Sequence, residues 1–242
     1  MFPLHIISAD SYEEMSIVAA DLFEEYTRNK PNACLSCAAG STQLGLYREL
    51  ASRYKKSSRS FRDFTFFNMD EYYGLTAEHP FSLGYFLNQN LYLPLDADPD
   101  RVHLPETGPS DPEKISAYDE EIEKHGGLDL LILGIGADGH IAFNMPDEVF
   151  HMPTHKQRLA DDIIAKNHAA FENPDEAPTH AVTIGMKSIM GAKKIILMAN
   201  GESKKQALTQ LLNEDTIDPR LPASILRLHR DVTVIADRPA FG

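Results

Sequence analysis

Short apolar runs alternate with amphipathic segments along most of the chain. Apolar runs of strand length predict strands at residues 4–7, 33–36, 64–68, 128–133, 181–184, 194–198 and 232–236. Apolar side chains at helical spacing predict helices at residues 11–28, 42–54, 113–125 and 203–212. The run at residues 128–133 is the most apolar and does not alternate with polar positions, which is typical of a strand covered on both faces.

The order of these elements predicts the fold class and the place where a ligand binds. Strands that alternate with helices favour an α/β fold with a doubly wound, mostly parallel sheet and helices on both faces. No repeat or linker interrupts the pattern, so residues 1–242 are predicted to form one domain, with the polar segment 147–178 as a lid or insertion. In such folds ligands bind beyond the carboxyl ends of the strands, so the motifs found there matter most.

A loop of small residues follows the predicted strand at residues 33–36. It contains Gly40, Ser41 and Thr42 and leads directly into a predicted helix. The glycine permits a tight turn, while the free N–H groups at the helix start and the two hydroxyls suit one phosphate group. The loop matches neither the Walker A motif nor the dinucleotide fingerprint, and a turn that only caps the helix is the alternative interpretation.

Two adjacent carboxylates, Asp70 and Glu71, follow the predicted strand at residues 64–68. A carboxylate at the end of a buried strand needs a partner or a use, because burial of its charge is unfavourable. Partial burial also makes a carboxylate more basic, which helps it to remove a proton bound to carbon. In the alternative interpretation Asp70 caps a helix and Glu71 is solvated.

A glycine-rich segment, residues 134–144, follows the most apolar strand. Asp138 and His140 lie two residues apart in it, so the carboxylate can orient the imidazole. The glycines, among them Gly136, let the backbone approach a ligand closely. The chain has no Gly-x-Ser-x-Gly motif, which argues against a hydrolase with a serine nucleophile.

Lys204 lies at the start of a predicted helix, where the helix dipole disfavours a positive charge. This position is reasonable if the lysine binds an anion. The alternative interpretation is a solvated surface lysine.

Charge and cysteine content narrow the function classes. The chain has 242 residues and a formal net charge of −13, which repels nucleic acid and anionic lipid, so we expect neither as a partner. No apolar run approaches the roughly 20 residues of a membrane span, and no secretion signal is evident, which predicts a cytoplasmic location. Cys34 and Cys37 lie in a predicted strand without a second ligand pair, so we expect two buried thiols and no metal site.

Together these motifs resemble the glucosamine-6-phosphate deaminase/isomerase family, which belongs to one superfamily with the 6-phosphogluconolactonases. The similarity covers nearly the whole chain and rests on residues 67–72, 74–75, 79–80, 82, 134–144, 221–224 and 228–229. The Gly-Asp-Gly-His motif is typical of the whole superfamily. Residues 68–72 are typical of the branch that acts on amino sugars.

The resemblance implies a modified doubly wound fold and conversion of an amino-sugar 6-phosphate, glucosamine or galactosamine 6-phosphate, to a ketose 6-phosphate and ammonia. It implies that the protein needs no metal and no other cofactor and that its partner is a small sugar phosphate. A homo-oligomer is possible. By position, Asp70 is then the base that moves a proton between C2 and C1, and His140 opens the sugar ring with Asp138 as its partner. The implied substrate-binding and phosphate-binding residues are Gly40, Ser41, Thr42, Glu71, Gly136 and Lys204.

Three features depart from the family pattern. Met145 stands where the family has a glutamate of the ring-opening group, so a glutamate introduced there is expected to raise turnover. Gln43 replaces a proline, and residues 167–178 lack the arginine that the family places against the phosphate.

Two alternative functions follow from these departures. A 6-phosphogluconolactonase also lacks a carboxylate at position 145, but it normally has an arginine where this chain has Tyr72. A sugar-phosphate-binding regulator without turnover is the other alternative, and retention of the two aspartates and the histidine argues against it.

Overall fold

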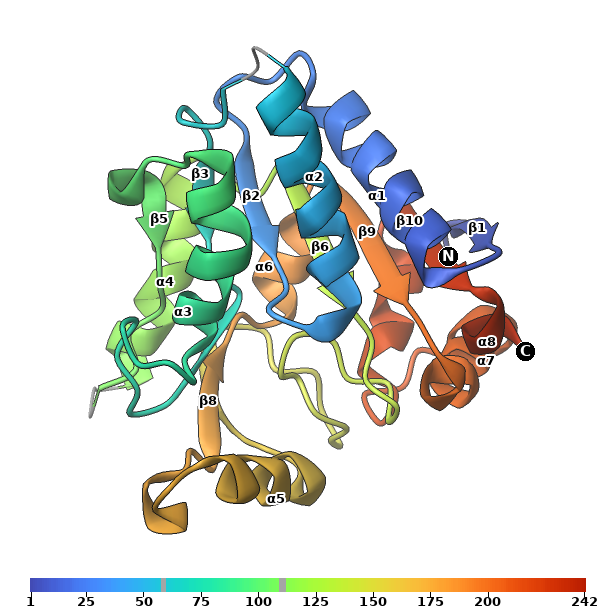
Figure 1. Cartoon of the computed structure of the whole chain (residues 1–242). Coiled ribbons are helices and arrows are strands. Elements are labelled where there is room, and N and C mark those ends of the chain that lie inside the picture. The colour runs from blue at the N-terminus through green and yellow to red at the C-terminus, as the bar shows by residue number, and fades with distance from the viewer. Residues whose placement is uncertain (58–59, 109–111) are drawn as a thin grey trace.

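The computed structural model describes residues 1–57, 60–108 and 112–242 and contains two sheets (Figure 1). The larger sheet has seven strands in the order β1-β10-β9-β6-β2-β3-β5, and every neighbouring pair is parallel. Its strands are β1 (His5–Ala9), β2 (Cys34–Cys37), β3 (Thr65–Phe67), β5 (Val102–His103), β6 (Leu130–Gly134), β9 (Lys194–Ala199) and β10 (Val232–Asp237). The apolar strand β6 lies at the centre of this sheet, as its unbroken hydrophobic pattern predicts.

Helices cover both faces of the parallel sheet. One face is covered by α1 (Tyr12–Thr27), α2 (Leu44–Lys56) and α3 (Leu83–Leu87). The other face is covered by α4 (Pro112–Lys124), α6 (Met186–Gly191), α7 (Lys205–Asn213) and α8 (Arg238–Phe241). Each layer has its own apolar core, because successive residues of a strand point to opposite faces. The predicted α/β fold class is therefore confirmed.

The two cysteines of β2 show this alternation directly. Cys34 belongs to the core on the α4 side of the sheet, and Cys37 belongs to the core on the α1 side. Both thiols are free and buried, as predicted. Burial raises the pKa of each thiol to about 12, which leaves them protonated and unreactive at neutral pH.

The predicted strand at residues 181–184 exists, but it lies outside the parallel sheet. It forms β8 (His180–Thr183), the middle strand of a small antiparallel sheet with β4 (Asp70–Tyr72) and β7 (His155–Arg158). The apolar pattern identifies a strand without identifying its partners, so this second sheet could not be predicted from the sequence. The small sheet matters because β4 begins at Asp70, one of the predicted site residues.

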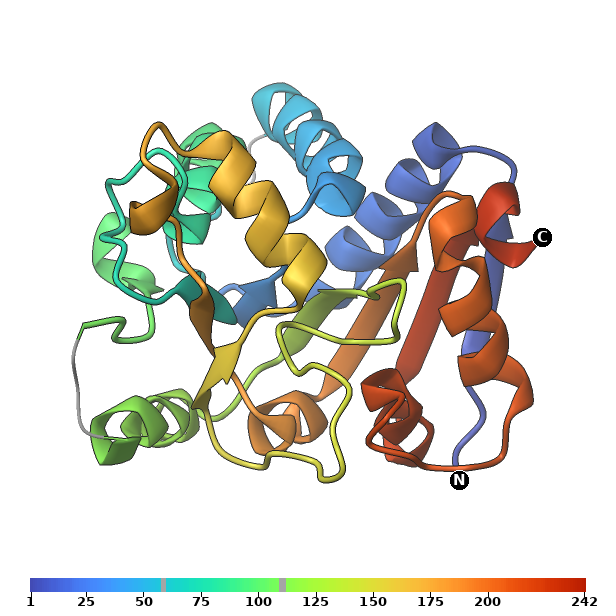
Figure 2. The ribbon, with the colours of Figure 1, turned by 90° about the horizontal axis from the view of Figure 1, so that it is seen from below.

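The polar segment 147–178 contains β7, α5 (Asp161–Ala170) and a short 3₁₀-helix (Pro174–Glu176). Helix α5 has no buried residue and lies below the carboxyl ends of the parallel strands (Figures 1 and 2). Its first turns contact the rest of the protein through Ile163 and Ile164, which pack against a small cluster containing Met145. Within the described ranges, none of the helices has the length and apolar character needed to span a membrane.

Candidate active site

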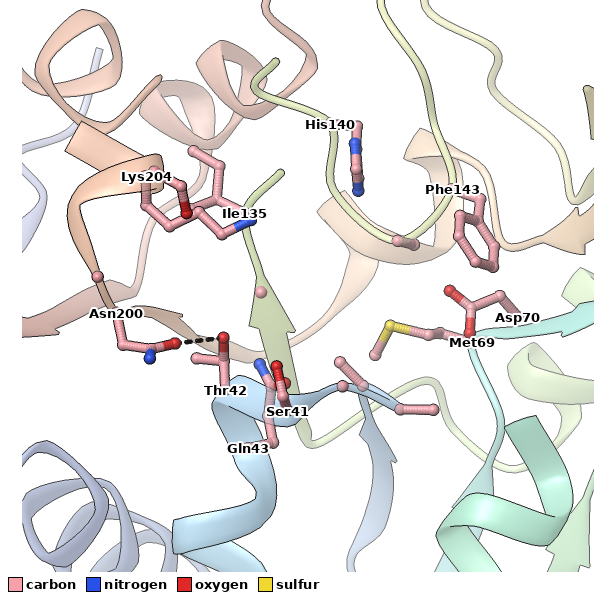
Figure 3. A pocket seen from close by; sticks show the side chains of 17 residues that line it. Ser41, Thr42, Gln43, Met69, Asp70, Ile135, His140, Phe143, Asn200 and Lys204 are labelled. Atoms are coloured by element: carbon pink, nitrogen blue, oxygen red, sulfur yellow. Dashed lines mark hydrogen bonds between the residues drawn. The ribbon is translucent and has the colours of Figure 1, made fainter. Parts of the chain in front are cut away.

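A cavity of about 520 Å³ lies at the carboxyl ends of β2, β6 and β9 (Figure 3). Its lining residues come from four chain segments, at residues 38–43, 69–70, 134–143 and 200–204. These segments are distant in sequence but meet here, because the carboxyl ends of parallel strands share one edge of the sheet. Six of the nine predicted site residues line the cavity, namely Gly40, Ser41, Thr42, Asp70, His140 and Lys204.

Asp70 supplies a buried carboxyl group to the wall of the cavity. The residue is only 7% exposed, and Figure 3 shows its side chain close to the ring of Phe143. Burial, followed by the charge of the neighbouring Glu71, raises the pKa of the Asp70 carboxyl to about 8. A carboxylate with this pKa is a far stronger base than an exposed one, which suits the removal of a proton from carbon.

His140, which lines the same cavity, forms a hydrogen-bonded pair with Asp138. The distance between His140 Nδ1 and Asp138 Oδ1 is 2.6 Å, and the backbone N–H of His140 also donates to Asp138 Oδ1. Burial raises the pKa of Asp138, but the hydrogen bonds and charge of His140 outweigh it, so this pKa is lower than usual. An ionised Asp138 accepts a hydrogen bond from the Nδ1–H group of His140, which leaves His140 Nε2 free to exchange a proton with a ligand.

Gly136 supports this pair and does not line the cavity. A Cβ atom on Gly136 would lie 2.2 Å from His140 Nδ1 and 2.5 Å from Asp138 Oδ1, so only glycine leaves room for the hydrogen bond. The backbone N–H of Gly136 also donates to the carbonyl of His140. The sequence placed Gly136 among the substrate-binding residues; the structure instead gives it a position behind the imidazole.

Gly136→Ala is therefore expected to lower turnover by roughly tenfold to a hundredfold, because it displaces the imidazole by about an ångström. Gly191→Ala is the matched control, since a Cβ at Gly191 would meet no atom within 4 Å. The comparison of the two variants by steady-state kinetics and by thermal unfolding separates a local effect on His140 from general destabilisation. Equal turnover in both variants would show that the His140–Asp138 contact does not limit the reaction.

Glu71 points away from the cavity. Its carboxylate accepts hydrogen bonds from the backbone N–H groups of Tyr72, Leu83 and Gly84, at 2.7, 2.9 and 2.7 Å. Burial raises the pKa of Glu71, and these hydrogen bonds lower it in part. The alternative in which Glu71 is solvated is wrong, since the residue is buried. The structure also does not place it among the lining residues; it joins β4 to the start of α3.

The opposite end of the cavity is suited to an anion. The hydroxyl of Thr42 donates to Asn200 Oδ1 at 2.6 Å and so connects the loop after β2 to the loop after β9 (dashed line, Figure 3). Lys204 is half-buried, and this burial lowers its pKa while the charge of Asp138 raises it. Among the described residues, no carboxylate oxygen lies within 4.0 Å of the Lys204 ammonium. A helix starts just after each loop, so its N–H groups add further donors.

Several residues of the site were missed by the sequence analysis. Phe143 and Asn200 line the cavity. Phe143 lies inside the glycine-rich segment 134–144 but was not singled out, and Asn200 lies just after the predicted strand at residues 194–198. Ala142 adopts a φ of 50°, a conformation unusual for a residue with a Cβ, and this turn places Phe143 beside Asp70 (Figure 3). Leu221 packs against Gly139, where a Cβ would lie 2.2 Å from Leu221 Cδ1. None of these contacts has a signal in the sequence of one chain.

Helix α5 approaches the same site from below. The Asn167 side chain forms a hydrogen bond with Tyr72, which lies two residues after Asp70. The rings of Tyr72 and Phe143 are 5.8 Å apart, and both pack against the cluster of Met145, Leu159 and Ala181. Met145 itself does not line the cavity. Met145, which stands where the family has a glutamate, therefore lies between the site and α5.

Fold and cavity together describe an α/β protein with a candidate small-molecule site at the carboxyl edge of a parallel sheet, with a carboxyl group and an imidazole toward one end and a lysine and two hydroxyl groups toward the other. A family model described as glucosamine-6-phosphate isomerases/6-phosphogluconolactonase matches residues 10–235. The chain therefore belongs to this family, as the sequence motifs indicated.

Individual relatives agree with this assignment. The glucosamine-6-phosphate deaminase of Thermoanaerobacter sp. (strain X514) is 41% identical over 238 residues, which are 98% of this chain and 94% of that protein. The glucosamine-6-phosphate deaminase of Clostridium botulinum (strain Hall) is 42% identical over 239 residues, or 98% and 97% of the two chains. Both relatives are thus similar to this chain along its length.

Solved structures give the same result. A monomeric glucosamine-6-phosphate deaminase has a TM-score of 0.91 and 35% sequence identity, and the match covers 98% of each chain. A 6-phosphogluconolactonase from Trypanosoma cruzi has a TM-score of 0.75 at 22% identity, with 99% of this chain and 96% of that chain covered. At this identity the second match shows a common fold and nothing more.

Proposed function

We propose that this chain converts glucosamine 6-phosphate to a ketose 6-phosphate and ammonia. The observation that carries the proposal is one cavity lined by Asp70, whose carboxyl group has a pKa of about 8, and by His140 of the His140–Asp138 pair, with Lys204 at its far end. The relatives at 41% and 42% identity are glucosamine-6-phosphate deaminases, which supports the same substrate.

Ring opening is the first step of the proposed reaction. A pyranose ring opens when the C1 hydroxyl loses a proton and the ring oxygen gains one, which a single imidazole can do in turn. His140 is the group in position for this exchange, because Asp138 fixes its Nδ1 and leaves Nε2 toward the cavity. The product is the open-chain aldehyde, which makes the hydrogen on C2 acidic.

Proton transfer between C2 and C1 follows. The Asp70 carboxylate removes the C2 proton to give an enolamine, and the resulting carboxylic acid returns a proton to C1. The product is an imine at C2, and its hydrolysis by water releases ammonia and leaves the ketose. The raised pKa of Asp70 suits both halves of this transfer, since the group must gain and lose a proton in the neutral range.

The anion end of the cavity holds the phosphate in this proposal. Ser41, Thr42, Lys204 and the helix-start N–H groups surround the phosphate, while the loop at Gly40 lets it approach the backbone. We assign segment 147–178, with α5, the role of a lid over the bound sugar. Because a sugar phosphate crosses membranes poorly, we also propose that the enzyme works in the cytoplasm.

One assay panel tests the proposal. Purified protein is incubated with glucosamine 6-phosphate, galactosamine 6-phosphate and 6-phosphogluconolactone, and release of ammonia or of acid is measured. Ammonia from glucosamine 6-phosphate is the expected result, and ammonia from galactosamine 6-phosphate alone would change the assigned sugar at C4. Acid from the lactone without ammonia would select the lactonase, and binding without any product would select the regulator.

Lys204→Ala is expected to raise KM for glucosamine 6-phosphate by roughly tenfold to a hundredfold and to change kcat little. A phosphate contact far from the reacting carbons stabilises ground state and transition state alike, so its loss appears in KM. Lys205→Ala is the matched control, because Lys205 is exposed and does not line the cavity. An unchanged KM for the Lys204 variant at moderate ionic strength would show that this lysine is only solvated.

A further inference from the structure

Gln43 is a buried polar residue whose side chain lacks a partner. It follows Thr42 in the loop after β2, lines the cavity and is only 1% exposed. In the part of the chain that the structure describes, its amide nitrogen Nε2 has no hydrogen-bond partner. Buried amide donors are nearly always hydrogen-bonded, because an unmade bond leaves the loss of hydration uncompensated. An unmade hydrogen bond in a side chain that lines a cavity therefore points to a ligand.

Two glycines provide the space that the Gln43 amide occupies. A Cβ on Gly40 would lie 3.0 Å from Gln43 Oε1, and a Cβ on Gly134 would lie 3.1 Å from Nε2. The amide thus fits between the loop after β2 and the end of β6, and Figure 3 shows Gln43 at the end of the cavity where Ser41 and Thr42 lie. This location is the anion end of the cavity, away from Asp70.

The charges around this end make a neutral donor useful. Lys204 is the one lysine or arginine among the residues that line the cavity in the described chain. The protein as a whole has a formal net charge of −13, so the site must hold a phosphate against an unfavourable field. An amide N–H donates strongly to a charged oxygen and brings no acceptor charge of its own.

We propose that Gln43 binds the phosphate group of the substrate through its side-chain amide, beside Ser41 and Lys204. The proposal rests on the proposed function only for the identity of the sugar, since inorganic phosphate offers the same acceptors. It adds a binding residue at a position where the family pattern has a proline, which has no such donor.

Titration calorimetry with inorganic phosphate at pH 8.5 tests the proposal, together with thermal unfolding in the absence of phosphate. Gln43→Met keeps the length of the side chain and removes the donor, so we expect it to weaken phosphate binding by roughly tenfold or more. The same variant should leave the Tm without phosphate unchanged or higher, because it removes an unpartnered buried amide. Gln43→Glu should bind phosphate more weakly still, since it replaces the donor by a carboxylate. Gln89→Met, at an exposed glutamine, is the matched control.

Each outcome decides for or against the donor role. Wild-type phosphate affinity in Gln43→Met, or no phosphate binding by the wild-type protein, overturns it. A loss of Tm together with affinity in Gln43→Met overturns it as well, because it would show that the side chain acts through packing. The proposed function is tested separately by ammonia release. If phosphate binding depends on Gln43 but no ammonia is released, only the proposed function is wrong. If ammonia is released but phosphate binding does not depend on Gln43, only the donor role of Gln43 is wrong.

Discussion

Asp70→Asn is expected to reduce ammonia release from glucosamine 6-phosphate by about 10²–10⁴ while phosphate binding stays near normal. The amide has nearly the shape of the carboxylic acid but cannot accept a proton from C2. Asp100→Asn, at an exposed aspartate, is the matched control. In the wild-type enzyme, kcat/KM should rise with pH through about 8, where Asp70 ionises. Full turnover by the Asp70 variant would remove this residue from the proposed mechanism.

The same substitution is expected to stabilise the protein at alkaline pH. The folded-state pKa of Asp70 is about 8, well above the roughly 3.9 of an unfolded chain. Below pH 4 the group is neutral in both states; as pH rises from 4 to 8 only the unfolded chain ionises, so stability falls across this window. Asp70→Asn should therefore have a higher Tm than wild type at pH 8.5 and a similar Tm at pH 4. A lower Tm at pH 8.5 would show that the carboxylate is stabilised by an interaction not recognised above.

The long elements of the fold could be predicted because each buries a regular pattern. Helices α1, α2, α4 and α7 bury apolar stripes, and their observed ends lie close to the predicted ones. Strand β4 begins with two carboxylates and β5 has only two residues, so neither contains an apolar run that could identify it. β5 is a strand because it pairs with β3, and β4 is a strand because it pairs with β8. Such pairing between distant segments cannot be predicted from a short stretch of sequence.

The location of the site could be predicted better than the direction of each side chain. Strand ends of a parallel sheet share one edge, so the loop at Gly40, the carboxyl of Asp70 and the imidazole of His140 meet as expected. Whether Glu71 faces the cavity depends on α3, whose first backbone N–H groups donate hydrogen bonds to its carboxylate. Likewise, the need for glycine at position 136 becomes clear only when the His140 imidazole is seen to pack against it. These directions follow from packing between segments distant in sequence.

Met145 is the position where the structure most changes an expectation. The family pattern has a glutamate there, and the sequence alone suggested that Met145→Glu would raise turnover. In the structure Met145 is only 9% exposed and packs with Leu159 and Ala181, and Ile163 and Ile164 of α5 pack against this cluster. A methionine fills such an irregular apolar space well. A glutamate at the same place would bury its charge among apolar side chains.

Met145→Glu is therefore expected to lower the free energy of unfolding by about 2–4 kcal/mol at pH 8. Burial raises the pKa of such a glutamate above its unfolded value, so this loss should shrink as pH falls toward 4 and the group becomes neutral. Ammonia release should fall as well, because α5 would lose its apolar contact beside Phe143. Urea unfolding and steady-state kinetics at both pH values measure these effects.

Two control variants separate charge from shape. Met145→Leu keeps an apolar side chain of similar volume and should stay within about 1.5 kcal/mol of wild type. Met145→Gln matches the glutamate without its charge, so a loss of stability that depends on pH in the glutamate variant alone identifies the buried carboxylate. The opposite result, faster ammonia release without a loss of stability, would mean that the new carboxylate turns from the cluster toward His140. In that case the methionine limits ring opening, and the apolar contact with α5 is secondary.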